Sequence, residues 1–248
     1  LTDSENYEIV TKEKSLLFKG FADNVSGLPD KIIVAVSAKE GYFQKEIFVS
    51  YFCVSGRITD FEGNPFPAPV IFQKKFFGGK TPSIGAWSDS DGKYSVVIPG
   101  GLYESFYVDD DSYKISTLEN WSWNMLVDGD EIHDFKIGNA EVYDLSVSVN
   151  ADNAERLRLS FRPMVLPQIR FEKTETILDG EKVFLWNNQP DIDKSDLRIT
   201  VDGKSVEILS LEKYYSFFRR KKDKIAMICY FADIKKPEFS KNKALIVL

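Results

Sequence analysis

The sequence predicts an all-β protein made of tandem β-sandwiches, and three observations support this prediction. Short runs of apolar, often β-branched residues recur along the chain, as in Lys31–Ser37 and Lys93–Ile98. Asp-Gly turns separate many of these runs, and glycine enters the positive-φ conformation of a tight hairpin without steric cost. Convincing amphipathic helices are few. Many short strands at regular spacing are typical of β-sandwiches, in which each sheet buries one face.

The clearest hairpin is Val201–Val206, in which Asp202-Gly203 separates two apolar runs, and Asp179-Gly180 marks a second turn. Leu209–Lys222 is the best candidate for a helix, although its aromatic residues suit a strand or a loop equally well. Strands are predicted at Lys31–Ser37, Glu46–Phe52, Lys93–Ile98, Glu141–Val149, Arg156–Phe161, Lys182–Trp186, Leu197–Val201, Ser205–Leu211, Lys224–Phe231 and Ala244–Leu248.

Charge divides the 248-residue chain into three parts, which we interpret as domains. Residues 1–52 carry 6 basic and 8 acidic groups, residues 53–150 carry 7 and 15, and residues 151–248 carry 19 and 15. The net charges are therefore −2, −8 and +4. We predict an N-terminal β-rich segment at 1–52, one β-sandwich at 53–150 and a second β-sandwich at 151–248.

Residues 54–94 contain a pattern of strand and turn residues. The pattern begins Val54-Ser-Gly56-Arg-Ile58-Thr-Asp60-Phe-Glu-Gly63-Asn-Pro65, continues with Pro69-Val70 and ends with Ser88-Asp-Ser-Asp91-Gly92-Lys-Tyr94. In physical terms, an apolar strand leads into a turn stiffened by proline, and an Asp-Gly turn precedes an inward-facing tyrosine. The pattern resembles the carboxypeptidase regulatory-like domain, a transthyretin-like, seven-stranded β-sandwich of many secreted and cell-surface proteins.

Later segments are similar to uncharacterised bacterial proteins that join this domain to a β-rich C-terminal partner. These segments are Gly101–Ser105, Leu118–Asn124, Glu141–Tyr143 and Phe161–Met164. The resemblance implies a transthyretin-like sandwich at 53–150, and we expect an immunoglobulin-like sandwich at 151–248. It also implies an extracellular or cell-surface location. The first ten residues contain neither the basic nor the apolar region of an export signal.

Composition argues against several classes of function. No run approaches the roughly 18 apolar residues that a membrane-spanning helix needs, so no membrane span is predicted. The chain has 32 basic and 38 acidic residues, and this net charge of −6 argues against nucleic-acid binding. A single histidine and two cysteines leave few ligands for zinc. We expect His133 at the surface, and we expect Cys53 and Cys229 to be buried free thiols, with a disulfide as the alternative.

Calcium needs only oxygen ligands, and carboxylates crowd the predicted loops of the middle domain. None of them follows the Asp-x-Asp-x-Asp-Gly type of loop with its closing glutamate. Ordinary turn and surface carboxylates are therefore the alternative to a calcium site, and no other cofactor is predicted. The candidate calcium ligands are Asp109, Asp110, Asp111, Asp128 and Asp130.

The segment Asn120–Asn124 has the sequence Asn-Trp-Ser-Trp-Asn. In a strand, period two places Trp121 and Trp123 on one face and the polar residues on the other. That aromatic face either packs into a core or a domain interface, or stays exposed as a platform for sugar rings. In the second case Asn120 and Asn124 are the candidates to supply hydrogen bonds. Two further tryptophans, Trp87 and Trp186, are weaker candidates.

Aromatic and basic residues alternate with each other in Lys213–Lys224. Such a run can bind an anionic polymer or a lipid surface. The simpler interpretation is a strand that ends in a solvated hairpin with Arg219–Lys224 at its tip. The overall acidic balance favours this second interpretation.

The sandwich architecture and the missing catalytic residues predict a non-catalytic binding or adhesion protein at the bacterial surface, with a protein or glycan ligand. The alternative is a carbohydrate-binding or structural accessory module of a secreted hydrolase system. An enzyme that uses paired carboxylates is a third hypothesis. The prediction is nevertheless that the chain is not an enzyme, because no Gly-x-Ser-x-Gly motif is present and the single histidine has no evident nucleophile.

Overall fold

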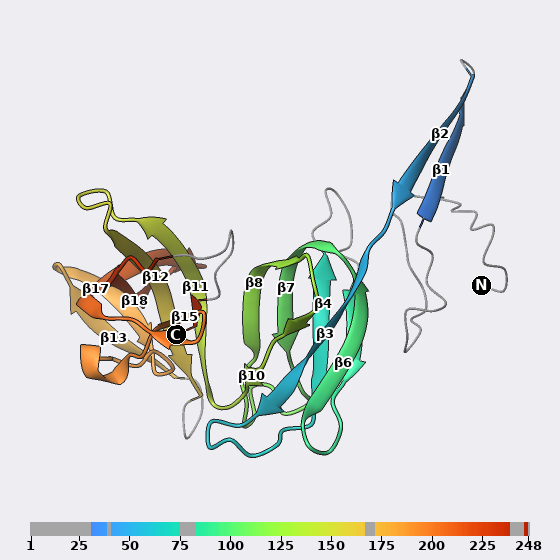
Figure 1. Ribbon diagram of the computed structural model, residues 1–248. Helices are drawn as coiled ribbons and strands as arrows, with labels where there is room; N and C mark the ends of the chain where they lie inside the picture. Colours follow the sequence, from blue (N-terminus) through green and yellow to red (C-terminus); the bar gives the residue numbers. More distant parts are fainter. Residues whose placement is uncertain (1–30, 39–40, 75–82, 167–171, 239–245, 248) are drawn as a thin grey trace. The chain divides into compact units, whose positions relative to one another are not determined.

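The computed structural model describes residues 31–38, 41–74, 83–166, 172–238 and 246–247, and it is all-β (Figure 1). The predicted fold class is therefore confirmed. One turn of 3-10 helix, η2 (Lys194–Asp196), is the helix of the described residues, and none of them forms a helix able to span a membrane. The chain divides into two compact units. The first comprises Leu1–Asp111 and Glu119–Ile137, and the second comprises Ser112–Leu118 and Gly138–Leu248.

The bounds of the strands follow the chain in order. The strands of the first unit are β1 (Lys31–Ala38), β2 (Gly41–Phe48), β3 (Tyr51–Thr59), β4 (Pro69–Lys74), β5 (Ser83–Trp87), β6 (Lys93–Pro99), β7 (Gly101–Val108), β8 (Asn120–Val127), β9 (Glu131–Ile132) and β10 (Phe135–Lys136). The strands of the second unit are β11 (Ala140–Val149), β12 (Arg156–Val165), β13 (Lys173–Leu178), β14 (Glu181–Trp186), β15 (Thr200–Val201), β16 (Lys204–Ser205), β17 (Ile208–Arg220), β18 (Asp223–Lys235) and β19 (Ile246–Val247).

Two four-stranded sheets form a β-sandwich in the first unit (Figure 1). One sheet has the order β10-β3-β6, with β9 also paired to β3, and the other has the order β5-β4-β7-β8. Strands β1 and β2 form a separate antiparallel hairpin. Because side chains alternate along each strand, each sheet of the sandwich turns one face toward the other sheet and one face away from it.

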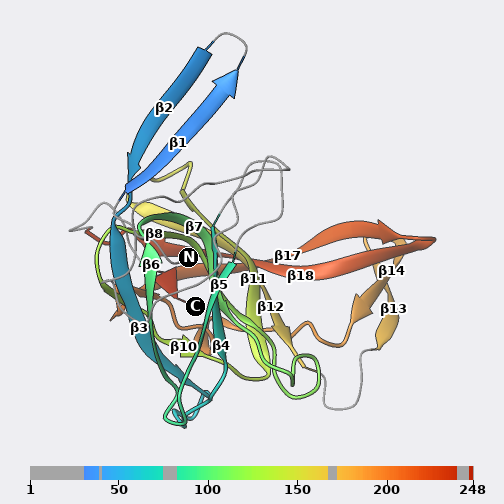
Figure 2. The same ribbon diagram turned by 90° about the vertical axis from the view of Figure 1, so that its right-hand side faces the viewer.

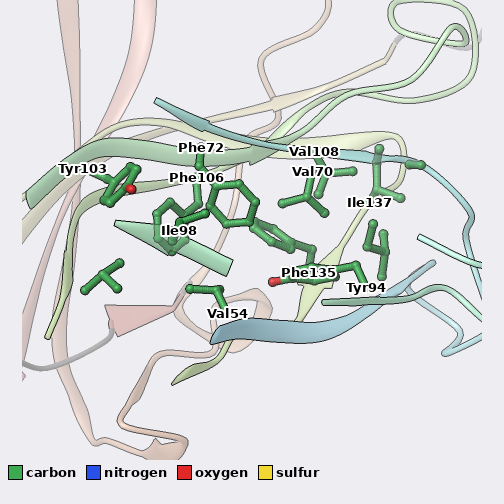
Figure 3. Packing of buried hydrophobic residues seen from close by; sticks show 13 residues of the cluster. Val54, Val70, Phe72, Tyr94, Ile98, Tyr103, Phe106, Val108, Phe135 and Ile137 are labelled. Carbon is green, nitrogen blue, oxygen red and sulfur yellow. The ribbon is translucent and has the colours of Figure 1, made fainter. Parts of the chain in front are cut away.

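Aromatic side chains fill the space between these two sheets (Figure 3). Phe72 of β4 and Phe106 of β7 meet edge to face with ring centroids 4.7 Å apart, and Tyr103 lies 5.5 Å from Phe106. From the opposite sheet, the hydroxyl of Tyr94 donates to the backbone carbonyl of His133. Such ring contacts stabilise a core by about 0.5–1.5 kcal/mol each beyond the burial of apolar area.

Two glycines of the sequence pattern are required by close backbone contacts. A Cβ atom on Gly56 would lie 2.1 Å from the carbonyl oxygen of His133, so any side chain there would separate β3 from the chain beside it. Gly92 has a φ of 74°, and a Cβ atom there would lie 2.2 Å from the carbonyl oxygen of Ile58. The Asp91-Gly92 turn therefore lies tightly against β3.

The second unit pairs a six-stranded sheet with a three-stranded sheet. The first has the order β11-β12-β18-β14-β13, with β17 also paired to β18, and the second has the order β16-β15-β19. Its buried residues come from both sheets, among them Leu159 and Phe161 of β12, Tyr230 of β18 and Val201 of β15. The rings of Phe161 and Tyr230 are stacked 5.8 Å apart. This arrangement is sandwich-like.

Both predicted Asp-Gly hairpin turns are confirmed. Asp202 and Gly203, between β15 and β16, have φ values of 50° and 74°. Asp179 and Gly180, between β13 and β14, have φ values of 52° and 79°. Two consecutive positive φ values are the conformation of the turn that matches the twist of a hairpin.

The helical alternative for Leu209–Lys222 is wrong, because this segment lies almost entirely in strand β17. Strands β17 and β18 are 13 residues long each and run side by side as an extended hairpin (Figure 2). The ring of Tyr214 stacks on that of Phe231 across the two strands, with centroids 4.3 Å apart. This cross-strand contact is available to a strand and not to an isolated helix, and it decides the ambiguous pattern.

The compact units divide the chain elsewhere than the predicted domain boundaries. The boundary between residues 150 and 151 falls between β11 and β12, which pair antiparallel with each other, so the second unit resumes at Gly138. The boundary between residues 52 and 53 falls inside β3. Of the N-terminal segment 1–52, the hairpin of β1 and β2 is described, while residues 1–30 lie outside the described residues.

Candidate functional site

The outer face of the β5-β4-β7-β8 sheet is the face turned away from the sandwich core. At β8 the direction of each side chain is clear from its partner. The hydroxyl of Ser122 lies 2.9 Å from Nε2 of His133, which is buried in the core, so Ser122 points inward. Trp121 and Trp123, one position to either side, therefore point outward.

Three rings are stacked on this outer face. Trp121 lies 4.1 Å from Tyr107 of β7 at an interplanar angle of 13°, and 4.9 Å from Trp123 at 8°. Trp123 is 48% exposed and Trp121 is half-buried, and neither belongs to the core of the first unit. The interpretation of both tryptophans as core residues is therefore wrong. The rings are held against each other and one of them is open to solvent.

Polar side chains accompany the stack. Oε2 of Glu119 accepts a hydrogen bond of 2.8 Å from Nε1 of Trp121. Gln73 of β4 accepts from the hydroxyl of Ser105 at 3.2 Å and donates to the hydroxyl of Tyr107 at 3.5 Å. We call the six residues Gln73, Ser105, Tyr107, Glu119, Trp121 and Trp123 the aromatic face.

A backbone irregularity turns the two indoles outward. Asn124 has a φ of 57°, and the pair that it would form with Glu104 is missing from the ladder between β7 and β8. Beyond it, Met125 and Val127 pack into the core. Without the irregularity, strict period two would put Trp121 on the same side as these two residues.

The two asparagines predicted as hydrogen-bond donors to a sugar are in different situations. Nδ2 of Asn120 donates to the backbone carbonyl of Lys136 at 2.7 Å, and Asn120 shares the inward parity of Ser122. Asn120 is therefore not part of the aromatic face. Asn124 is exposed beside Trp123 and holds the left-handed conformation described above. Its role is to direct the strand.

Gln73, Ser105, Tyr107 and Glu119 were not predicted from the sequence. They join the tryptophans through strand register, in which Tyr107 is opposite Trp121 and Ser105 is opposite both Trp123 and Gln73. A hairpin of Gly101–Val108 with Asn120–Val127 would have suggested this register. The 11-residue connection between the two strands carries no turn signal that fixes it.

The five candidate calcium ligands do not come together. Asp109, Asp110 and Asp111 follow β7, whereas Asp128 and Asp130 follow β8 at its far end, roughly 26 Å along the strand. Oδ1 of Asp130 accepts a hydrogen bond from the backbone amide of Cys53 at 2.8 Å. Among the described residues, no group of three or more histidine, cysteine or acidic side chains is arranged to hold a metal ion.

His133 is buried rather than at the surface, which corrects the sequence-based expectation. It is 5% exposed, and its ring meets those of Phe106 and Phe135 at 5.8 Å and 4.7 Å. Burial lowers its pKa to about 4, against the opposing charge of Asp134. Both cysteines are free thiols, and Cys229 is buried whereas Cys53 is half-buried.

The basic run of the second unit forms the predicted hairpin tip. Residues 219–222 are exposed at the turn between β17 and β18. Next to them, Lys224 lies over the ring of Phe217 at 4.6 Å and pairs with Glu181. A surface hollow of about 650 Å³ elsewhere in this unit has Asp191 paired with Lys213 at 2.7 Å. Its charged groups are therefore directed at each other.

Neither a protein-family model nor a curated protein sequence matches this chain. Among solved structures, it is similar to a DUF3823 family protein from Parabacteroides merdae (14% identity, TM-score 0.26, 50% of this chain and 63% of that one). It is also similar to a protein from Bacteroides uniformis described provisionally as carbohydrate binding (12%, 0.28, 74% and 78%). A third is a DUF3823 family protein from Bacteroides ovatus (11%, 0.26, 79% and 81%). We take no functional conclusion from similarities at this level.

Proposed function

We propose that this protein is a non-catalytic binding protein of the extracellular space or the cell surface and that its aromatic face binds glycans. The observation that carries this proposal is the stack of Trp121 and Trp123, with Trp123 48% exposed. The flat faces of sugar rings present C–H groups that pack on an indole. The hydroxyl groups at their edges exchange hydrogen bonds with amides and carboxylates such as those of Gln73 and Glu119.

Exposure of this stack argues against a purely structural role. Burying large aromatic rings is among the strongest contributions to a core, and an exposed aromatic cluster is typical of an interaction site. The carboxypeptidase regulatory-like pattern of residues 54–94 supports an extracellular location. The net charge of −6 argues against nucleic acid as the ligand.

The experiment is a glycan array followed by calorimetric titration of the glycans that bind. We expect Trp123→Ala to weaken binding at least tenfold, because it removes the exposed surface on which a sugar ring packs. Ile132→Ala is the matched control, since it removes an apolar side chain that is 82% exposed on β9, in the other sheet of the same unit. We expect this control to bind like the unchanged protein.

Two results would contradict the proposal. One is an array on which no glycan binds. The other is a Trp123→Ala variant that folds and binds with unchanged affinity, because the ligand would then use another surface. Thermal melting of both variants checks that each is folded before binding is compared.

A further inference from the structure

Two carboxylates border the aromatic face at the end where β7 finishes and β8 begins. Asp109 directly follows β7 with the parity of Tyr107, and Glu119 directly precedes β8 with the parity of Trp121. Burial raises the pKa of the Tyr107 hydroxyl, and the charges of Asp109 and Glu119 raise it further. Both carboxylates therefore act on the ring that forms part of the stack.

Asp109 has an acceptor that no described residue uses. Its Oδ1 atom is buried and has no hydrogen-bond partner among the described residues. Burial also raises the pKa of this carboxyl, with the neighbouring charges of Asp110 and Asp111 adding to the effect. An unsatisfied buried acceptor costs about 1–3 kcal/mol, which a hydroxyl donor would offset.

The opposite side of the same outer face is low and ends in another tryptophan. Trp87, at the end of edge strand β5, is opposite Pro69 of β4 and is 75% exposed. Between Trp87 and the stack lie Gly85, which has no side chain, and Ile71, which is opposite both Gly85 and Tyr107. Three strand spacings, about 14 Å, separate β5 from β8. This width suits a chain of sugars rather than a single ring.

We propose that the ligand of this face is an uncharged glycan chain and that acidic glycans, whose sugars carry carboxylates, are rejected. The inference rests on the proposed function. A neutral sugar presents hydroxyl donors to Asp109 and Glu119. A uronic acid presents a second carboxylate, which cannot donate and is repelled. Residues 53–150, with their net charge of −8, reinforce the repulsion at low ionic strength.

The test compares neutral glycans with their uronic counterparts of the same linkage: glucan with glucuronan, galactan with galacturonan, and mannan with mannuronan. Titrations are made at low salt with the full chain. We expect the neutral member of at least one pair to bind ten times more tightly than its uronic counterpart. In the double variant Asp109→Asn, Glu119→Gln, this ratio is expected to fall below three, because the amides keep acceptor oxygens and remove the charge.

The outcomes separate this inference from the proposed function. Uronic glycans that bind as tightly as the neutral ones overturn the inference and leave glycan binding standing. A ratio that is unchanged in the double variant also overturns it, because the selectivity would then not come from these carboxylates. If no member of any pair binds, the proposed function fails and the inference fails with it. Thermal melting shows whether the double variant is folded.

Discussion

The two faces of the β5-β4-β7-β8 sheet are both rich in aromatic residues, but they differ in what covers them. On the inner face, Phe72 and Phe106 are 0% exposed and pack against the opposite sheet. On the outer face, Trp123 is 48% exposed. Between the two tryptophans of β8, the polar Ser122 points into the core, where it meets His133. One strand thus buries a hydroxyl and exposes indoles.

This comparison teaches that stability alone does not explain the placement of side chains on β8. Burying an indole contributes more to folding than burying a hydroxyl, which needs a partner to offset its desolvation. The left-handed conformation of Asn124 produces the reversed placement, at a local cost in backbone energy. A structural cost accepted at one position is typical of a surface kept for binding.

The largest effect is expected on the inner face. Phe106→Ala removes a fully buried ring that contacts Phe72 and Tyr103, so we expect the free energy of unfolding to fall by about 3–5 kcal/mol. The measurement is urea unfolding followed by tryptophan fluorescence in a Trp186→Phe background. The remaining three tryptophans all lie in the first unit, so the signal reports that unit. A loss below about 1 kcal/mol would contradict this account of the core.

The inner face also carries a pH-dependent element. His133 is neutral in the core with a pKa of about 4, whereas an unfolded histidine has a pKa near 6.5. The unfolded state therefore takes up a proton first, so the full stability holds above pH 6.5 and is lost as the pH falls to about 4. The loss amounts to about 3 kcal/mol. His133→Gln, which keeps a partner for Ser122, should lack this part of the pH dependence.

Unfolding curves of both proteins at several pH values between 7.5 and 4 provide the measurement. The carboxylates of the chain titrate in both proteins, so the difference between the two curves isolates His133. Parallel curves would show that the histidine is hydrated and titrates normally in the folded state. The same Trp186→Phe background keeps the signal within the first unit.

A smaller effect is expected at the boundary between the two faces. Asn124→Val places a β-branched residue at a φ of 57°, and we expect a loss of about 1–2 kcal/mol in the free energy of unfolding. Asn124→Gly is the matched control, because glycine accepts this conformation, and its effect should stay within about 0.5 kcal/mol. Equal stability of the two variants would show that the conformation of residue 124 is not what shapes β8.

The sequence was sufficient for the parts of the fold that depend on local physics. Period two predicted that Trp121 and Trp123 share a face, and paired Asp-Gly residues predicted the turn at 202 and 203. The same period could not say which side of the sheet the indoles take. That depends on a change of direction at Asn124, and nothing in a single asparagine distinguishes it from an ordinary exposed residue.

Long-range pairing was the other limit of the sequence. Tyr107 and Gln73 reach the tryptophans through the register of three strands, which no local pattern encodes. His133 was expected at the surface because three acidic residues lie within three positions of it. Its burial depends on strands that pair over it from elsewhere in the chain, and its hydrogen bond to Ser122 makes that burial tolerable.

The smallest effect on stability is expected on the outer face. Trp123→Ala removes a half-exposed ring with one stacking partner, so the free energy of unfolding should fall by about 1 kcal/mol, far less than for Phe106→Ala. Exposure can be measured directly in a Trp87→Phe, Trp186→Phe background, where only the two stacked indoles fluoresce. Acrylamide should quench this fluorescence strongly, and a bound glycan should protect it. Fluorescence that resists the quencher without ligand would mean that the face is covered in solution, and the two faces would then not differ.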